Sequence, residues 1–177
     1  MLTVLLGGAR SGKSRLAIEL AVEAGELVTY LATAPDIPGD HELALRVARH
    51  RAERPPTWST IEEQLDLAGA LARVETPIVV VDCLTVWLGN MMFHEHHEAA
   101  IVEASDAAIN AIGERRLEAV VVSNEVGLGV IPANELAREY RDLLGRVNQR
   151  WVAAADHALL MVAGRALELA NPRGLLR

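Results

Sequence analysis

The chain has 177 residues, a length typical of a single domain with a substantial core. Hydrophobic residues make up 51% and aromatic residues only 3%, so we expect a core of Ala, Val, Leu and Ile, as in parallel α/β sheets. The formal net charge of −7 argues against nucleic acid or an anionic membrane surface as the main partner. We therefore expect one α/β domain over residues 1–177.

The cysteine content and the apolar runs bear on the compartment. Cys83 is the only cysteine, which excludes a disulfide framework and favours the cytoplasm, with the thiol packed at a strand end. The apolar residues 1–6 are too few for a signal peptide and follow no basic segment. Because no run approaches the roughly 18 apolar residues of a membrane span, we expect no span.

The chain opens with a strand, a glycine-rich loop and a helix. Apolar residues 2–6 lead into Gly7-Gly8-Ala9-Arg10-Ser11-Gly12-Lys13-Ser14, and a helical pattern follows as far as Gly25. Glycines allow backbone N–H groups to point at a phosphate chain, and the helix N-terminus adds its positive dipole end. In such a loop, Lys13 reaches the β- and γ-phosphates and the Ser14 hydroxyl binds Mg²⁺. The flanking strand and helix favour a nucleotide site over a chance glycine turn.

A strand over 27–32 and a loop containing two prolines precede a basic helix over 40–53. Arg46, His50 and Arg54 are spaced four residues apart and share one face. Two interpretations stay open from this spacing. The residues form either a solvated basic face or a phosphate-handling face in which His50 is a nucleophile or an acid–base group.

The next segment has the pattern of a helix start. Ser59 or Thr60 would be the N-cap, and Glu62 or Glu63 would reach back in a capping box. We therefore predict a helix from this point to about residue 73.

A continuous β-branched run over 77–82 ends in Asp82, which is typical of a buried parallel strand that delivers a carboxylate at its C-terminal edge. In a P-loop protein, this acid contacts Mg²⁺ directly or through water. The alternative is an acid that only caps the following helix. Residues 83–92 are apolar and predict a helix or lid near the site.

The C-terminal half alternates helices and strands. The pattern predicts helices over 98–116 and 134–155, strands over 119–123 and 157–163, and a short edge strand over 165–169. Glu125 follows a strand beside a glycine-rich turn. It either orients a hydroxyl or ligates Mg²⁺, or it is a turn carboxylate without a catalytic role. His94, His96 and His97 have no partner cluster at ligand spacing, which favours a surface loop over a metal site.

Together, these segments resemble the bifunctional adenosylcobinamide kinase / adenosylcobinamide-phosphate guanylyltransferase family of cobalamin biosynthesis. The resemblance covers nearly the whole chain. It rests on the glycine loop, on Arg46, His50, Arg54-Pro55 and Trp58, on Asp82-Cys83-Leu84-Thr85 with Asn90, on Ser123-Asn124-Glu125-Val126-Gly127, on Val130-Ile131-Pro132, and on Gly145-Arg146-Val147-Asn148-Gln149.

The resemblance implies a RecA-like P-loop fold with a mostly parallel central sheet flanked by helices, assembled as a homotrimer. It implies phosphorylation of adenosylcobinamide by a nucleoside triphosphate, ATP or GTP, and then GMP transfer from GTP to adenosylcobinamide phosphate through a guanylylated histidine. By position that histidine is His50, with Lys13 and Glu125 as further catalytic groups and Mg²⁺ held by Ser14 and Asp82. The implied nucleotide-binding residues are Gly7, Gly8, Ala9, Arg10, Ser11, Gly12, Lys13, Ser14, Arg46, Arg54, Glu62 and Asp82.

Two other functions remain alternatives. A monofunctional P-loop small-molecule kinase would leave His50 as a surface residue. A nucleotide-dependent regulatory ATPase or GTPase would transfer nothing to a metabolite.

Overall fold

The computed structural model describes residues 1–35 and 39–175, and within α2 (His41–Ala52) it leaves the side chains of Glu42, Leu43 and Arg46 undescribed. The prediction for Arg46 therefore lies outside the described residues, as do residues 36–38 of the predicted loop with two prolines. All other predicted site residues are described.

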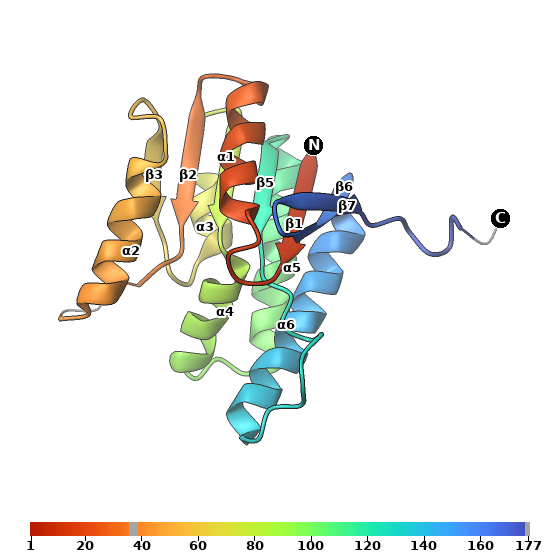
Figure 1. Cartoon of the computed structure of the whole chain (residues 1–177). Coiled ribbons are helices and arrows are strands. Elements are labelled where there is room, and N and C mark those ends of the chain that lie inside the picture. Colours follow the sequence, from red (N-terminus) through yellow and green to blue (C-terminus); the bar gives the residue numbers. More distant parts are fainter. Residues whose placement is uncertain (36–38, 176–177) are drawn as a thin grey trace.

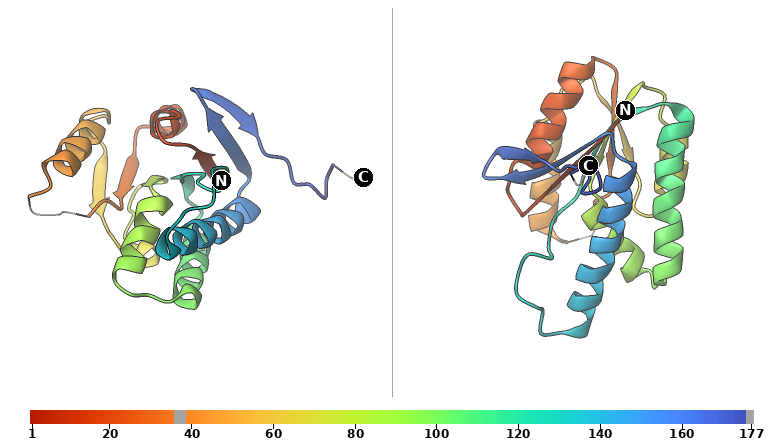
Figure 2. Two further views of the ribbon diagram at one scale, coloured as in Figure 1. Left: turned by 60° about the horizontal axis from the view of Figure 1, so that its bottom comes forward. Right: turned by 90° about the vertical axis from the view of Figure 1, so that its right-hand side faces the viewer.

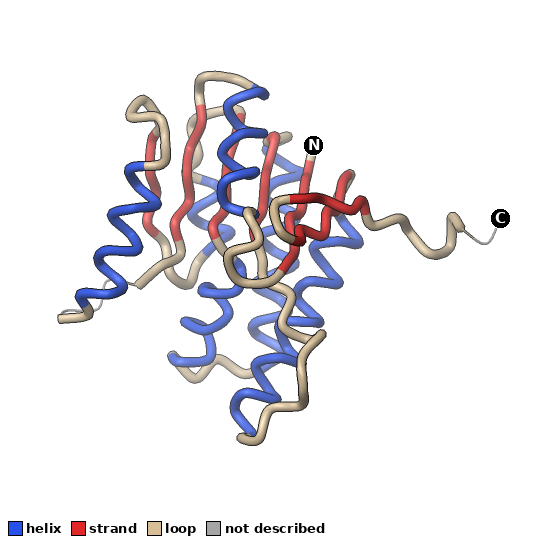
Figure 3. Tube along the Cα trace, viewed as in Figure 1, coloured by secondary structure: helices blue, strands red, loops and turns tan. Residues whose placement is uncertain are grey.

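A seven-stranded sheet forms the centre of the molecule (Figures 1 and 3). Its order is β3-β2-β4-β5-β1-β6-β7, and every pair is parallel except β6 with β7. The strands are β1 (Leu2–Gly7), β2 (Val28–Ala32), β3 (Ser59–Glu62), β4 (Ile78–Asp82), β5 (Glu118–Val122), β6 (His157–Val162) and β7 (Arg165–Glu168). The mostly parallel sheet confirms the predicted fold class.

Helices cover both faces of the sheet, as the end-on view in Figure 2 shows. α1 (Lys13–Ala24) and α2 lie on one face, and the opposite face carries α3 (Leu67–Ala72), α4 (Leu84–Phe93), α5 (Glu98–Arg115) and α6 (Glu135–Ala154). Over the described ranges 1–35 and 39–175, no helix is both long and apolar enough to cross a membrane.

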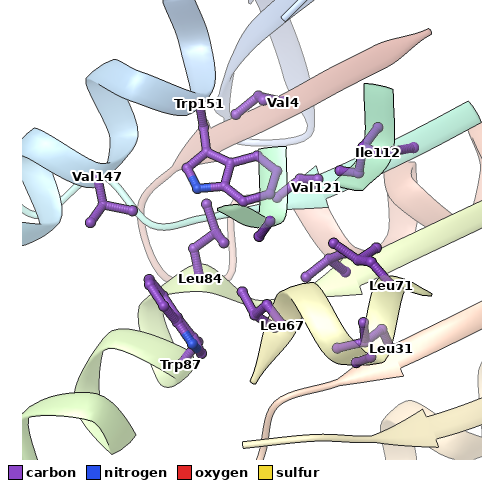
Figure 4. Packing of buried hydrophobic residues seen from close by; sticks show 14 of the residues in the cluster. Val4, Leu31, Leu67, Leu71, Leu84, Trp87, Ile112, Val121, Val147 and Trp151 are labelled. Atoms are coloured by element: carbon purple, nitrogen blue, oxygen red, sulfur yellow. The ribbon is translucent and has the colours of Figure 1, made fainter. Parts of the chain in front are cut away.

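Alternate residues of each strand enter two separate hydrophobic layers. Val79 and Val81 of β4 belong to the larger cluster, which contains the fully buried Trp87 and Trp151 (Figure 4). Val80 belongs to the smaller cluster under α1. Because side chains alternate between the faces of a strand, Asp82 lies on the α1 side, where the glycine loop enters its helix.

One predicted element is wrong. Residues 59–62 form strand β3 and do not begin a helix, because they pair in parallel with β2, and the Ser59 hydroxyl lies 2.8 Å from that of Thr29. The following helix, α3, begins later, at Leu67, and its N-cap is Asp66, whose Oδ1 accepts a 2.8 Å hydrogen bond from the amide of Gly69. A Ser-Thr pair followed by glutamates suits a strand edge as well as a cap, and pairing with β2 decides between them.

Candidate functional site

The glycine loop connects β1 to α1 and is shaped by positive backbone angles. Gly7 has φ 149° and Gly12 has φ 100°, conformations that side chains disfavour. A Cβ atom at Gly7 would lie 2.4 Å from the carbonyl oxygen of Met161, so only glycine fits there. The loop therefore ends at the N-terminus of α1, where main-chain N–H groups and the helix dipole favour an anion.

Lys13, the only lysine in the chain, folds back onto this loop. Its Nζ donates hydrogen bonds to the carbonyl oxygens of Gly7 and Gly8 at 2.9 and 2.7 Å, and lies 3.3 Å from Oγ of Ser11. Burial lowers the pKa of Lys13, while the neighbouring Cys83 and Asp82 act in the opposite direction. The ammonium group is thus held at the loop, next to the acid of β4.

Two later segments support the loop from the side. The amide of Gly164, in the turn between β6 and β7, donates a 3.0 Å hydrogen bond to the carbonyl of Ser11. The amide of Glu125 donates a 3.0 Å hydrogen bond to the carbonyl of Gly7. The Glu125 carboxylate accepts a 2.6 Å hydrogen bond from the amide of Gly127, so in this structure it closes its own turn beside the loop.

Asp82 ends β4 with its carboxylate among three donors. The Tyr30 hydroxyl donates a 2.6 Å hydrogen bond to Oδ2. Burial acts to raise the pKa of Asp82, but its interactions with His50, Tyr30 and Ser14 outweigh burial, and the pKa lies below its usual value. Asp82 therefore remains an anion, in contact with the Ser14 of the glycine loop on one side and with α2 on the other.

His50 lies near the C-terminal end of α2 and faces Asp82. Its Nδ1 is 3.8 Å from Oδ2 of Asp82, and about a third of its side chain, 32%, is exposed. A small pocket opens between α2 and the sheet, lined by His50 and by Tyr30, Ala32, Ala34, Val47, Arg54, Asp82, Cys83 and Val86. The imidazole is therefore both oriented by an acid and accessible to a ligand.

Arg54 connects the end of α2 to the sheet. Its Nε donates a 2.9 Å hydrogen bond to the carbonyl oxygen of His50, and its guanidinium carbon lies 3.7 Å from the centroid of the Tyr30 ring. This geometry suits a cation–π contact. Arg54 thus fixes the main chain that carries the histidine.

The structure gathers most of the predicted site at the C-terminal edge of the sheet. Lys13, Ser14, Asp82, His50 and Arg54 form one continuous cluster. Glu62 is exposed and pairs with Arg51 at 2.7 Å. It lines a groove along α2 that adjoins the His50 pocket, since Ala32, Ala34 and Val47 line both. Ala9 and Arg10 lie exposed on the glycine loop.

Sequence reasoning missed Tyr30, although a signal was available. Tyr30 is opposite Val80 in the β2–β4 register, and Ala32 is opposite Asp82. Residues two apart share a face, so a long side chain at position 30 can reach diagonally to position 82. Strand pairing had to be known before this neighbour could be named.

The cluster fits the Mg²⁺ of a P-loop site. Mg²⁺ takes oxygen ligands, keeps several waters and needs only one or two protein groups in addition to the phosphates. Ser14 supplies a hydroxyl, and the adjoining Asp82 supplies a carboxylate held in its charged form. Among the described residues, no group of three or more His, Cys, Asp or Glu side chains could hold a metal ion.

Comparison with solved structures supports the fold. The chain superposes on the RadB recombinase with a TM-score of 0.50 at 16% identity, over 90% of this chain and 73% of that one. A likeness at this level concerns the RecA-like P-loop fold alone.

Sequence comparison identifies the family. The chain is 43% identical to the bifunctional adenosylcobalamin biosynthesis protein CobP of Pseudomonas aeruginosa, over 96% of this chain and 97% of that protein. It is 36% identical to CobU, of the same description, from Salmonella typhimurium, over 96% of this chain and 99% of that protein. Residues 3–169 match the model of an enzyme family. The chain therefore belongs to the cobinamide kinase / cobinamide phosphate guanyltransferase family.

Proposed function

We propose that this protein phosphorylates adenosylcobinamide with ATP or GTP and then transfers GMP from GTP to adenosylcobinamide phosphate, releasing pyrophosphate. The observation that supports both reactions is the position of Asp82 between the glycine loop and His50. One bound triphosphate could then serve either half-reaction, because the loop and the histidine adjoin the same acid.

In the kinase half, the protein's task is to hold and neutralise the triphosphate. Lys13 would leave the carbonyl oxygens of Gly7 and Gly8 and bind the β- and γ-phosphates, while loop N–H groups bind phosphate oxygens. Ser14 and Asp82 would hold Mg²⁺, which supplies charge neutralisation on the phosphates. Glu125 adjoins the loop and is our candidate for orienting the attacking hydroxyl.

In the transferase half, His50 acts as a nucleophile. Its Nδ1 faces Asp82, so Nε2 would carry the lone pair that attacks the α-phosphorus of GTP. An N–P bond forms, the bond from the α-phosphorus to the bridging oxygen breaks, and pyrophosphate leaves with that electron pair. Asp82 stabilises the positive charge that develops on the imidazole.

The second step restores the enzyme. A phosphate oxygen of adenosylcobinamide phosphate attacks the same phosphorus, a P–O bond forms, and the N–P electron pair returns to Nε2. The proton on Nδ1 stays in place throughout, so both charge and atoms balance. Lys13 and Arg54, and the predicted Arg46, would stabilise phosphate charge during these steps.

The experiment is incubation with GTP labelled at the α-phosphate. We expect acid-labile, hydroxylamine-sensitive label on the protein that is lost in His50→Ala and retained in His41→Ala, an exposed histidine on the same helix. His50→Ala should still phosphorylate adenosylcobinamide, whereas Lys13→Ala should lose both reactions.

Other outcomes would identify the alternative functions. Phosphorylated adenosylcobinamide without any protein-bound label would indicate a monofunctional kinase. Nucleotide hydrolysis with neither phosphate nor GMP on the corrinoid would indicate a regulatory ATPase or GTPase. Equal loss of both reactions in His50→Ala would contradict the division of labour proposed here.

The remaining expectations concern organisation. We infer a single nucleotide-binding catalytic domain over 1–177 that acts in the cytoplasm as a homotrimer. Exposed apolar side chains in the segment after β5 support association between protomers, since Leu128 is 83% and Val130 is 94% exposed. Light scattering coupled to size exclusion would test the trimer, and a monomer mass would contradict it.

A further inference from the structure

Tyr30 occupies a position between the two parts of the transferase site. It lies in β2, on the same face of the sheet as Asp82 in the neighbouring strand, two residues out of register. The side chain is 3% exposed, so its hydroxyl is removed from bulk water and needs a partner inside the protein.

The hydroxyl has one strong partner. It donates a 2.6 Å hydrogen bond to Oδ2 of Asp82, the same oxygen atom that faces Nδ1 of His50 at 3.8 Å. A hydrogen bond to a carboxylate is stronger and more directional than one between neutral groups. Tyr30 therefore restricts the rotation of the carboxylate and keeps Oδ2 on the side of the histidine.

The ring of Tyr30 has a second partner just beyond the end of the helix that carries the histidine. The guanidinium carbon of Arg54 lies 3.7 Å from the ring centroid, and Nε of Arg54 binds the carbonyl oxygen of His50. Few other anchors hold this end of α2, because every residue of the helix whose side chain is described is exposed or only partly buried. A single tyrosine thus contacts both the acid that orients the imidazole and the arginine that fixes its main chain.

We propose that Tyr30 is a positioning residue for the guanylylation of His50. Its hydroxyl orients the Asp82 carboxylate toward Nδ1 of His50, and its ring packs against Arg54, which binds the main-chain carbonyl of the histidine. This inference rests on the proposed guanylyl transfer. Tyr30 contacts Asp82 and Arg54, whereas the Lys13 ammonium is held by carbonyl oxygens of the glycine loop, so we expect triphosphate binding to depend on Tyr30 less than guanylylation does.

The test compares Tyr30→Phe, which removes the hydroxyl but keeps the ring, with Tyr30→Leu, which also removes the ring that Arg54 contacts. In single turnovers with α-labelled GTP, Tyr30→Phe is expected to slow labelling of His50 about tenfold or more, as for other groups that orient an active-site ligand. The KM for GTP should change less than about twofold, and phosphorylation should slow by a smaller factor than labelling. Tyr30→Leu should slow labelling further.

Two variants separate positioning from a general loss of structure. Tyr140→Phe removes the other tyrosine hydroxyl of the chain, which donates a 2.9 Å hydrogen bond to the carbonyl of Thr85, and should leave labelling unchanged. Replacement of Tyr30 by p-aminophenylalanine restores a donor at the same place and should recover much of the rate lost in Tyr30→Phe.

The outcomes distinguish the two proposals. Wild-type protein that takes no label on His50 overturns the proposed transferase function. Wild-type labelling with an equal rate in Tyr30→Phe overturns only the role of Tyr30. The role of Tyr30 is also overturned by equal losses in both reactions, or by p-aminophenylalanine giving no recovery.

Discussion

Arg54 donates a hydrogen bond from Nε to the carbonyl oxygen of His50, four residues earlier, at 2.9 Å. This carbonyl lies at the end of α2, where main-chain acceptors lack partners within the helix. Arg54, four residues after His50, therefore caps the turn that carries the histidine.

The first prediction concerns this cap. Arg54→Ala should slow guanylylation of His50 about tenfold, because the turn loses both its hydrogen bond and the contact with Tyr30. Arg54→Lys should not restore the rate, since an ammonium group lacks the planar guanidinium and its Nε donor. Arg51→Ala is the matched control, because the side chain of Arg51 pairs with Glu62 and both partners are exposed. Rates would be measured by label retention, and a larger effect from Arg51 would contradict this view.

The second prediction uses the single lysine. An acyl-phosphate derivative of ATP or GTP, which transfers its tag to a nearby amine, should modify Lys13 at the glycine loop. Peptide mass spectrometry would locate the tag, and excess GTP with Mg²⁺ should suppress it. Tagging only of the Met1 amino group, or no protection by GTP, would place the triphosphate elsewhere.

The third prediction concerns the core under α6. Leu144 is fully buried there, so Leu144→Ala should lower the free energy of unfolding by about 2–5 kcal/mol through lost contacts and a cavity. Leu136 lies on the same helix but is 66% exposed, and Leu136→Ala should change it by less than about 0.5 kcal/mol. Urea unfolding monitored by circular dichroism gives both values. Similar values for the two variants would mean that the Leu144 face of α6 is not the face packed in the core.

The fourth prediction concerns alkaline pH. Burial raises the pKa of both tyrosines, Tyr30 and Tyr140, well above the usual value of 10.0. The folded protein therefore keeps their protons at a pH where the unfolded chain loses them, so the stability contributed by these groups is present below pH 10 and falls as pH rises above it. At pH 11, the raised pKa of each tyrosine should lower the free energy of unfolding by on the order of 1 kcal/mol.

Tyrosinate absorbance at 295 nm reports this titration directly. Native protein should show little tyrosinate at pH 11, whereas protein in urea should titrate near pH 10. Tyr140→Phe should lose less stability than wild type between pH 9 and 11. A native titration near pH 10 would mean that both hydroxyls are open to solvent.

Much of the fold could be predicted because each signal is local. The glycine loop, the β-branched run that ends at Asp82 and the start of the helix predicted from residue 134 depend on neighbours within a few residues, and all three agree with the structure. The prediction of a helix start at residues 59–62 was wrong because the deciding contact is not local. Their strand exists only because β2 lies alongside, and this contact spans about thirty residues of sequence.

The residues of the candidate site also fall into those that local sequence patterns predict and those that depend on strand pairing. Lys13 and Ser14 belong to a contiguous motif. His50 lies on the predicted basic helix, whereas Arg54 follows the end of that helix at Ala52. Tyr30 carries no motif, and its importance appears only once β2 and β4 are paired in register. Glu62 came into the predicted set through the family resemblance. It lines a groove that shares Ala32, Ala34 and Val47 with the His50 pocket, and its nucleotide contact stays a prediction.

Asp82 reaches the nucleotide side only because it has the same parity in β4 as Val80. Deleting a single residue from the interior of that strand would turn the acid toward the tryptophan-filled layer, where no phosphate could meet it. An insertion in the exposed stretch 94–97, beyond α4, would leave the acid where it is. Tolerance to changes in length is therefore set strand by strand, and β4 is among the segments where the count of residues matters as much as their identity.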